Sequence, residues 1–414
     1  MKEEQLSGSI SLNSSVQTKV QEDVMEKSIT APLVLLLAVA TGMGVASIYY
    51  AQPLLEAIRG TLGMNVVGAG LIITASQLGY AIGLILLVPL GDLFERRKLV
   101  VIMMIGIAVC LAGIGFSSNG FILLLLSVVV GALSVVAQIL VAFSADLARA
   151  AERGRVVGTV MSGLLLGILL ARTVAGIIAQ SYSWRAVFWL AAGMMLLIAL
   201  MMYRGLPLRT PNVKSSYLAL LRSLLVLFKE ERILRVRSLY GAIAFGIFSA
   251  LWTPLAFLLS KPPFNYAPGI IGLFGLAGIA GAVAASMAGR LADRGSAGRT
   301  TFATIILLIA SWLPIWLGRH SVLLLIAGIV LADLGIQALH ITNQSEIYRL
   351  RPEARSRLTS AYMASFFAGG VIGSSISMLV YTSAGWTGVC VFGVALGLVA
   401  AIVWVGEKRT AGET

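Results

Sequence analysis

"VPLGDLFERRK" (residues 88–98) follows one long apolar stretch of the chain, and "GRLADRGSAGR" (residues 289–299) follows another. Both contain an aspartate near basic residues, and Asp92 lies 201 positions before Asp293. Two further pairs recur at offsets of 201 and 202 residues: Pro53 with Pro254, and Trp184 with Trp386. Matches at nearly one offset indicate an internal duplication in parallel orientation. The chain should therefore consist of two halves that share one architecture.

The composition is that of an integral membrane protein. Of the 414 residues, 58% are hydrophobic and 12% are charged, which is far more apolar than a soluble globular protein. A membrane helix needs about 20 mostly apolar residues, so an all-α membrane protein is expected. Twelve candidate spans can be marked between polar breaks: 32–55, 66–90, 98–116, 120–143, 157–180, 186–203, 238–260, 268–289, 300–318, 321–345, 358–381 and 386–406.

The formal net charge of +13 could indicate a nucleic-acid partner, so the placement of the 31 Lys and Arg residues decides the matter. With the N-terminus on the cytoplasmic side, 26 of them fall in the tails and in alternate loops on that side. Only Arg59, Arg185, Lys261 and Arg319 fall in the opposite loops, and Arg172 alone lies inside a span. This bias follows the positive-inside rule. It predicts a multi-pass inner-membrane protein with both termini cytoplasmic and no nucleic-acid partner.

The polar segments set the expected domain boundaries. Residues 1–30 lack the layout of a cleavable signal peptide and are interpreted as a disordered cytoplasmic tail. The first six-helix half is placed at 31–203 and the second at 238–406, with a tail at 407–414. The linker 204–237 carries apolar residues at helical spacing from Tyr217 to Phe228, which suits either a helix on the inner membrane surface or a simple connector helix.

The repeated loop resembles the G-x-L-A-D-R-x-G-R-R/K signature of the major facilitator superfamily. Val88, Leu93 and Glu95 depart from that pattern, but the twelve spans and the duplication agree with it. The resemblance implies two six-helix halves that rock around a central site. Polar groups at this loop could latch one conformation or simply anchor the cytoplasmic side. The candidate latch residues are Asp92, Arg96, Arg97, Asp293 and Arg294.

Two departures concern the drug:proton antiporter-like branch of that superfamily, which the chain resembles. That branch commonly has an arginine four residues before a glycine matching Gly131, where this chain has Ser127. "ARTVAG" (residues 171–176) aligns with its G-P-x-x-G-G motif, so Arg172 occupies the usual proline position. The same span carries small residues for close helix contact, namely Gly158, Gly163, Gly167 and Gly176. An arginine is thus absent from the fourth span and present in the fifth.

The resemblance places the first, fourth, seventh and tenth spans around the central cavity. On the tenth, Asp333, Gln337, His340 and Gln344 follow a spacing that puts them on one helical face. Gln138 belongs to a weaker polar stripe on the fourth. Burial disfavours the charged form of a carboxylate, so Asp333 is the candidate proton carrier, and His340 could extend a proton path or be a neutral hydrogen-bonded residue.

Aromatic residues and Arg172 complete the candidate site. Tyr49, Tyr50 and Gln52 lie at the end of the first span, and Trp252 lies at the matching end of the seventh. The aromatic rings suit apolar or cationic ligands, but an interfacial belt is the first interpretation. Arg172 is expected at the cavity or at the seam between halves. It could bind an anionic substrate group, form an ion pair with Asp333, or hold the halves together.

These features predict a monomeric secondary active transporter that exports a small organic compound in exchange for protons. Proton-coupled or facilitated uptake is the main alternative, and a membrane sensor or assembly partner without transport is the second. No nucleophile-base constellation, metal-ligand cluster or nucleotide-binding loop occurs outside the spans, and Cys110 and Cys390 both lie within them. We therefore expect neither an enzyme nor a bound metal or cofactor.

Overall fold

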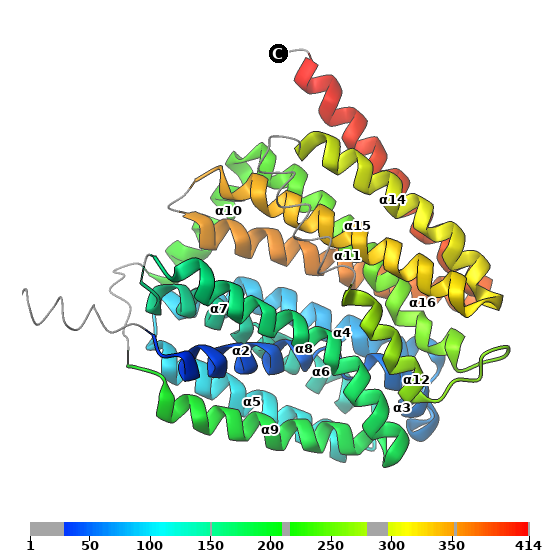
Figure 1. Cartoon of the computed structure of the whole chain (residues 1–414), viewed down its shortest axis with the longest axis horizontal. Coiled ribbons are helices and arrows are strands. Elements are labelled where there is room, and N and C mark those ends of the chain that lie inside the picture. The colour runs from blue at the N-terminus through cyan, green and yellow to red at the C-terminus, as the bar shows by residue number, and fades with distance from the viewer. Residues whose placement is uncertain (1–28, 150, 209–215, 280–296, 352–353, 413–414) are drawn as a thin grey trace, which may run out of the picture.

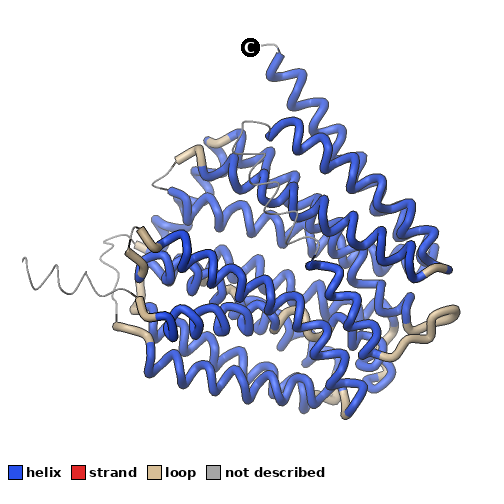
Figure 2. The backbone as a smooth tube through the Cα atoms, viewed as in Figure 1, coloured by secondary structure: helices blue, strands red, loops and turns tan. Residues whose placement is uncertain are grey.

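The computed structural model describes residues 29–149, 151–208, 216–279, 297–351 and 354–412. Every regular element within these ranges is an α-helix or a short 3-10 helix (Figure 2), which confirms the predicted all-α fold. Nine helical segments in the described ranges are long and apolar enough to cross a membrane. The predicted spans 98–116, 186–203 and 321–345 each correspond to one such helix.

The first half begins with a broken helix. The predicted span 32–55 divides into α2, a turn and the short 3-10 helix η1, whose second residue is Pro53. Proline has no backbone N–H to donate and fixes φ, so it suits the start of a new helical segment. The helices of this half are α2 (Ala31–Ala46), η1 (Gln52–Leu54), α3 (Leu55–Leu62), α4 (Val66–Leu86), η2 (Val88–Asp92), α5 (Arg96–Phe116), α6 (Gly120–Ser134), α7 (Val136–Leu147), α8 (Arg153–Ser181) and α9 (Trp184–Gly205).

The second half follows the linker helix α10 (Tyr217–Glu230). Its elements are α11 (Arg232–Leu259), α12 (Pro268–Leu273), η3 (Phe274–Ala277), α14 (Ala297–Leu317), η4 (Gly318–His320), α15 (Val322–Tyr348) and α16 (Arg355–Gly412). The long α16 contains Gly385 with φ 62° and ψ −158°, a conformation that L-residues avoid. Gly385 therefore separates the two predicted spans 358–381 and 386–406.

The predicted number of twelve spans is not tested at the eighth span. The expected eighth span, 268–289, begins with α12 and η3, and its later residues lie outside the described ranges. Figure 1 shows α5 and α9 in the lower part of the view and α14 and α15 in the upper part, so the helices of the two halves gather on opposite sides of the bundle.

Large apolar side chains cover the outside of the bundle. Leu35, Ile102, Phe116 and Leu323 are between 63% and 80% exposed. Exposed apolar surface on this scale indicates contact with apolar surroundings. For helices of this length those surroundings are the lipid bilayer.

Close helix contacts in the first half depend on glycines that the sequence placed in the fifth span. A Cβ atom on Gly163 would collide with the backbone oxygen of Ala38, and one on Gly167 would collide with that of Gly42. These two glycines let α8 approach α2 as a small-residue seam requires. Gly158 differs, because a Cβ there would have no neighbour within 4 Å among the described residues.

The two halves meet along two lines of contact. On one line, α4 faces α16, where the Thr74 and Ser374 hydroxyls are 2.8 Å apart. On the other line, α8 faces α12, where the Thr173 hydroxyl donates to the Gly272 carbonyl oxygen at 3.1 Å. A Cβ atom on Gly176 would collide with the Pro268 carbonyl oxygen. The C-terminal part of α8 and the helix α12 are therefore packed backbone to backbone.

The linker contains the helix that its apolar spacing predicted. Leu224 and Leu227 of α10 are buried, whereas Leu218 is 74% exposed. The Tyr217 hydroxyl donates to the Leu86 carbonyl oxygen at 2.9 Å. Helix α10 thus connects the two halves and also presents an apolar edge, a combination that suits both interpretations of this segment.

Candidate functional site

Arg172 lies at the seam between the halves. It occupies α8, is 3% exposed, and donates from Nε to Oε1 of Gln52 at 2.5 Å. Its guanidinium carbon is 5.0 Å from the ring centre of Tyr49, 5.3 Å from that of Phe248 and 4.1 Å from that of Trp252. Two of these four partners belong to the first half and two to α11. The arginine therefore contacts both halves and is shielded from lipid.

Trp252 connects Arg172 to the candidate proton carrier. Its indole nitrogen donates to Oδ1 of Asp333 in a long hydrogen bond of 3.5 Å, and Asp333 is 4% exposed on α15. No ion pair joins Arg172 and Asp333, both of which are described. A fixed ion pair between these two residues is thus wrong for this conformation, because the guanidinium stacks on the indole ring instead.

Tyr49, Tyr50 and Trp252 are buried, at 4% to 6% exposure. The first interpretation of these rings, an interfacial aromatic belt, is therefore wrong: a belt needs side chains that reach the lipid headgroups. Tyr49 and Trp252 pack against Arg172, whereas the Tyr50 hydroxyl points to the sulfur of Met43 at 3.8 Å.

The predicted polar face of the tenth span divides into separate environments. His340 lies within hydrogen-bond distance of Tyr362 on α16, with 2.9 Å between Nδ1 and the hydroxyl oxygen, so it fits the hydrogen-bonded alternative. Its ring centre is 4.7 Å from that of Phe366. Gln337 and Gln344 are partly exposed. Asp333 is thus the residue of this face that approaches the Arg172 group.

The polar side chains of the fourth span already have hydrogen-bond partners. Ser127 and Ser134 donate to the carbonyl oxygens of Leu123 and Val130 in their own helix. Gln138 donates to the Tyr80 hydroxyl at 3.3 Å, within the first half. These groups are therefore engaged in local hydrogen bonds in this conformation.

A polar contact between halves joins the second span to the second half. The Gln77 amide nitrogen donates to Ser249 at 2.8 Å, and the Ser374 hydroxyl donates to the Gln77 carbonyl oxygen at 3.3 Å. The serines did not stand out in the sequence, because single serines are common in membrane helices. Phe248 was also missed, although its place one helical turn before Trp252 was a usable signal.

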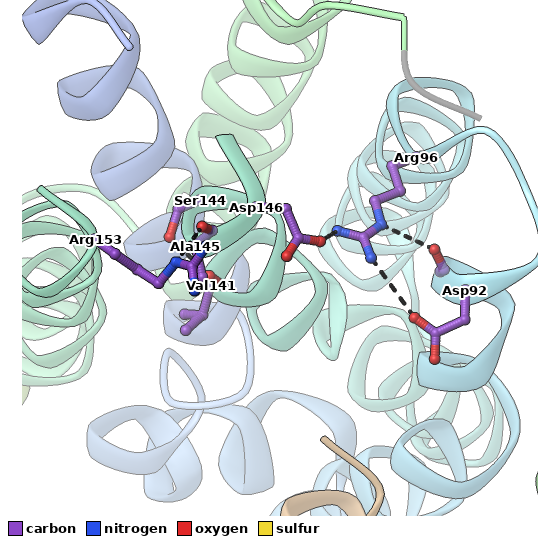
Figure 3. A network of polar contacts seen from close by, with 8 residues as sticks. Asp92, Arg96, Val141, Ser144, Ala145, Asp146 and Arg153 are labelled. Atoms are coloured by element: carbon purple, nitrogen blue, oxygen red, sulfur yellow. Dashed lines mark hydrogen bonds and ion pairs between the residues drawn. The ribbon is translucent and has the colours of Figure 1, made fainter. Parts of the chain in front are cut away.

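The first-half latch residues form a network within their own half (Figure 3). Asp92 lies 3.6 Å from Arg96, whose Nε donates to the Gly91 carbonyl oxygen at 3.0 Å. Arg96 also pairs with Asp146 at the end of α7. The loop is thereby attached to the fourth span. Asp293 and Arg294 lie outside the described residues, so the second copy is not compared.

Two neighbouring residues of this loop have separate roles. Arg97 donates to the Leu206 carbonyl oxygen at 3.3 Å and stacks on Tyr203 at 4.7 Å. Glu95 is the N-cap of α5 and accepts from the backbone N–H groups of Arg97 and Lys98 at 2.8 and 3.0 Å. A carboxylate suits this position because it satisfies free N–H groups and interacts favourably with the helix dipole. The departure from the family glycine thus has a structural reason.

Two helical halves that enclose buried polar groups at their seam define a membrane transporter rather than an enzyme. The family model "Major Facilitator Superfamily" matches residues 34–319 and 264–414. The chain therefore belongs to the major facilitator superfamily.

Curated relatives agree with this assignment. The uncharacterized transporter YgaY of Escherichia coli O157:H7 is 52% identical over 90% of this chain and 94% of its own length. A probable transporter of Streptomyces coelicolor is 33% identical over 86% and 83%. A probable sugar efflux transporter of Helicobacter pylori is 26% identical over 85% and 88%. The chain is accordingly a multi-pass membrane transporter.

Solved structures support the same fold. A bacterial homologue of the human lysosomal transporter Spinster, in an inward-facing and occupied conformation, superposes with a TM-score of 0.75. The alignment covers 92% of this chain and 97% of that one, at 15% sequence identity. At this identity the likeness concerns the fold alone.

Proposed function

We propose that this transporter exports small organic compounds in exchange for protons, as in the drug:proton antiporter-like branch. It acts as a monomer in the cytoplasmic membrane, with both termini cytoplasmic and with its halves alternating access to a central site. The observation that carries the proposal is the buried chain of contacts from Gln52 through Arg172 and Trp252 to Asp333, which crosses the seam between halves.

The location of these contacts supports alternating access. Gln52 and Arg172 belong to the first half, and Trp252 and Asp333 belong to the second. Any rocking of one half against the other changes the distance between Arg172 and Trp252. A ligand at this seam therefore has different affinities for the two conformations, which is the requirement for shifting an equilibrium between them.

Asp333 supports proton coupling. It is buried without an ion-pair partner among the described residues, and its one hydrogen bond is the long contact from Trp252. Ionised carboxylates in such surroundings are costly, and their protonation state responds to small changes nearby. Asp333 can thus take up a proton in one conformation and release it in the other.

Export is proposed as the direction because the motif resemblance is to antiporters, and because one relative is named as an efflux transporter. Proton-coupled uptake is the alternative and requires the same residues. The two are distinguished by where the compound accumulates under an imposed pH difference: an antiporter accumulates it on the more acidic side of the membrane, and a proton-coupled symporter accumulates it on the less acidic side.

The experiment uses purified full-length protein in vesicles that enclose a pH-sensitive dye. A panel of organic compounds is added outside, and compound-dependent proton movement is compared with that in protein-free vesicles. Asp333→Asn should lose this movement. Glu346→Gln, which neutralises a carboxylate that pairs with Arg349 one turn away, should retain it.

Three results would count against the proposal. Proton movement that is unchanged in Asp333→Asn would refute the carrier role. Flux without proton movement in the wild type would replace coupling by facilitated transport. Folded wild-type protein that moves no compound would favour a sensor or assembly partner.

A further inference from the structure

The guanidinium of Arg172 has more hydrogen-bond donors than the surrounding chain uses. A guanidinium carries five N–H donors. Nε donates to Gln52, whereas Nη2 is fully buried and has no acceptor among the described residues. The structure gives Nη1 no acceptor in those residues either. Burying unsatisfied donors on a charged group is costly, so this edge of the guanidinium is available to an acceptor from outside the chain.

The surrounding rings hold the cation without neutralising it. Tyr49, Phe248 and Trp252 lie within 5.3 Å of the guanidinium carbon, measured to each ring centre. Ring faces attract a cation, but they do not accept the in-plane hydrogen bonds of a guanidinium. With Nε fixed by Gln52, the group is immobilised while its remaining N–H fork stays free.

A small cavity that Arg172 helps to line lies between the halves. Arg172 lines it together with Gln52, Trp252, Leu255, Ala256 and Ile271. Arg172 is the one charged residue among the described residues that line it. A cationic compound would thus be repelled at this position, and a neutral one would leave the charge of the guanidinium uncompensated.

We propose that the transported compound carries a carboxylate, which binds the Nη edge of Arg172, while its apolar part packs against Trp252 and Ile271. A planar carboxylate matches the two parallel N–H groups of a guanidinium edge. The chemical class is therefore a small organic acid in its anionic form. The claim that this compound is transported rests on the proposed transport function. The claim that it binds Arg172 is independent of that function.

Asp333 does not fill this role in the observed conformation. Its Oδ1 atom accepts from Trp252, which lies on the same half as Asp333, and no ion pair brings it to Arg172. Trp252 therefore lies between Arg172 and Asp333 in this chain of contacts. The anion site and the candidate proton site are adjacent but separate.

The test is equilibrium binding at neutral pH, with no proton gradient, to purified full-length protein in lipid nanodiscs. The probes are benzoate, phenylacetate, indole-3-acetate and hexanoate, each paired with its neutral amide, with benzylamine as a cation. Binding is followed by the shift of thermal unfolding and by saturation-transfer NMR of the ligand. At least one acid should bind about tenfold or more tightly than its own amide, which corresponds to about 1.4 kcal/mol.

Variants locate the site. Arg172→Gln should abolish the preference for acid over amide, and Arg172→Lys should retain part of it because the charge remains but the fork is lost. Arg59→Gln removes an arginine that pairs with Glu56 one turn earlier on its own helix, and it should bind the acids as the wild type does. The wild-type comparison of each acid with its amide needs no variant, so it stands even where a variant fails to fold.

The proposal is overturned if the wild type binds the amides as tightly as the acids, binds only benzylamine, or binds none of the acids. It is also overturned if folded Arg172→Gln keeps the full preference. The two proposals can fail separately. If acids bind but are not moved in vesicles, the anion site is supported and the transport function is refuted. If compounds are moved but no acid binds, the transport function is supported and the anion site is refuted.

Discussion

Gln77 stabilises the observed conformation through hydrogen bonds from one half to the other. It lies on α4, and its partners Ser249 and Ser374, at 2.8 and 3.3 Å, lie on α11 and α16. A hydrogen bond of this kind contributes about 0.5–1.5 kcal/mol net. Removing both with Gln77→Ala should weaken the conformation by about 1–3 kcal/mol, which shifts the equilibrium between conformations about 5- to 150-fold.

The shift can be measured by electron paramagnetic resonance distances between spin labels. In a background with Cys110 and Cys390 replaced by serine, labels are attached at Tyr182→Cys and Lys261→Cys. Both positions are exposed and lie near the ends of α8 and α11 where α12 packs. The parent protein should give mainly the shorter distance. Gln77→Ala should increase the population of a longer one.

The matched control is Gln138→Ala. Gln138 bonds to Tyr80 within the first half, so its loss should leave the distance distribution unchanged. If Gln77→Ala is folded and gives the same distribution as its parent, the inference that these bonds select a conformation is refuted.

Three further changes test other parts of the structure. Gly167→Leu should destabilise the protein by at least about 1–3 kcal/mol in thermal unfolding, because its side chain collides with α2, whereas Gly158→Leu should be tolerated. Trp252→Phe keeps a ring beside Arg172 but removes the donor to Asp333, so exchange of labelled substrate should survive better than in Trp252→Leu. Arg96→Gln leaves Asp92 and Asp146 without their shared guanidinium, and should lower stability by about 1 kcal/mol.

Each of these three has a contrary result. Equal unfolding temperatures for Gly167→Leu and Gly158→Leu would refute close packing of α8 on α2. Equal exchange by Trp252→Phe and Trp252→Leu would show that ring contact with Arg172 is unimportant. An unchanged unfolding temperature in Arg96→Gln would mean that the loop network contributes nothing to stability.

The fold followed from patterns that are local in sequence. Apolar length predicted most helices, and the repeated loop with its aspartate predicted two related halves. The break at Gly385 falls between the predicted spans 358–381 and 386–406. An exception arose where backbone geometry interrupts an apolar stretch: Pro53 begins a new helical segment inside the predicted span 32–55. Hydropathy alone does not register such breaks.

The sequence predicted candidate site residues but not which of them contact one another. The sequence singled out Arg172 and Asp333 because charges are unusual inside membrane spans, and Trp252 because an aromatic ring at the end of a span suits a ligand as well as an interfacial belt. It did not predict that Trp252 would contact both charged groups. Residues 172, 252 and 333 belong to three different helices, and helical periodicity carries no information about which faces meet across the seam. The same limit explains why Ser249 and Ser374 were missed.

Asp333 tests the central claim most directly, through a comparison of two modes of transport in the same vesicles. Once a substrate is known, Asp333→Asn should still exchange labelled for unlabelled substrate, because the neutral amide mimics the protonated carboxyl. It should fail to accumulate substrate against a concentration gradient when a pH difference is imposed, whereas the wild type accumulates it. Gradient-driven accumulation by Asp333→Asn at the wild-type level would contradict proton coupling through this residue.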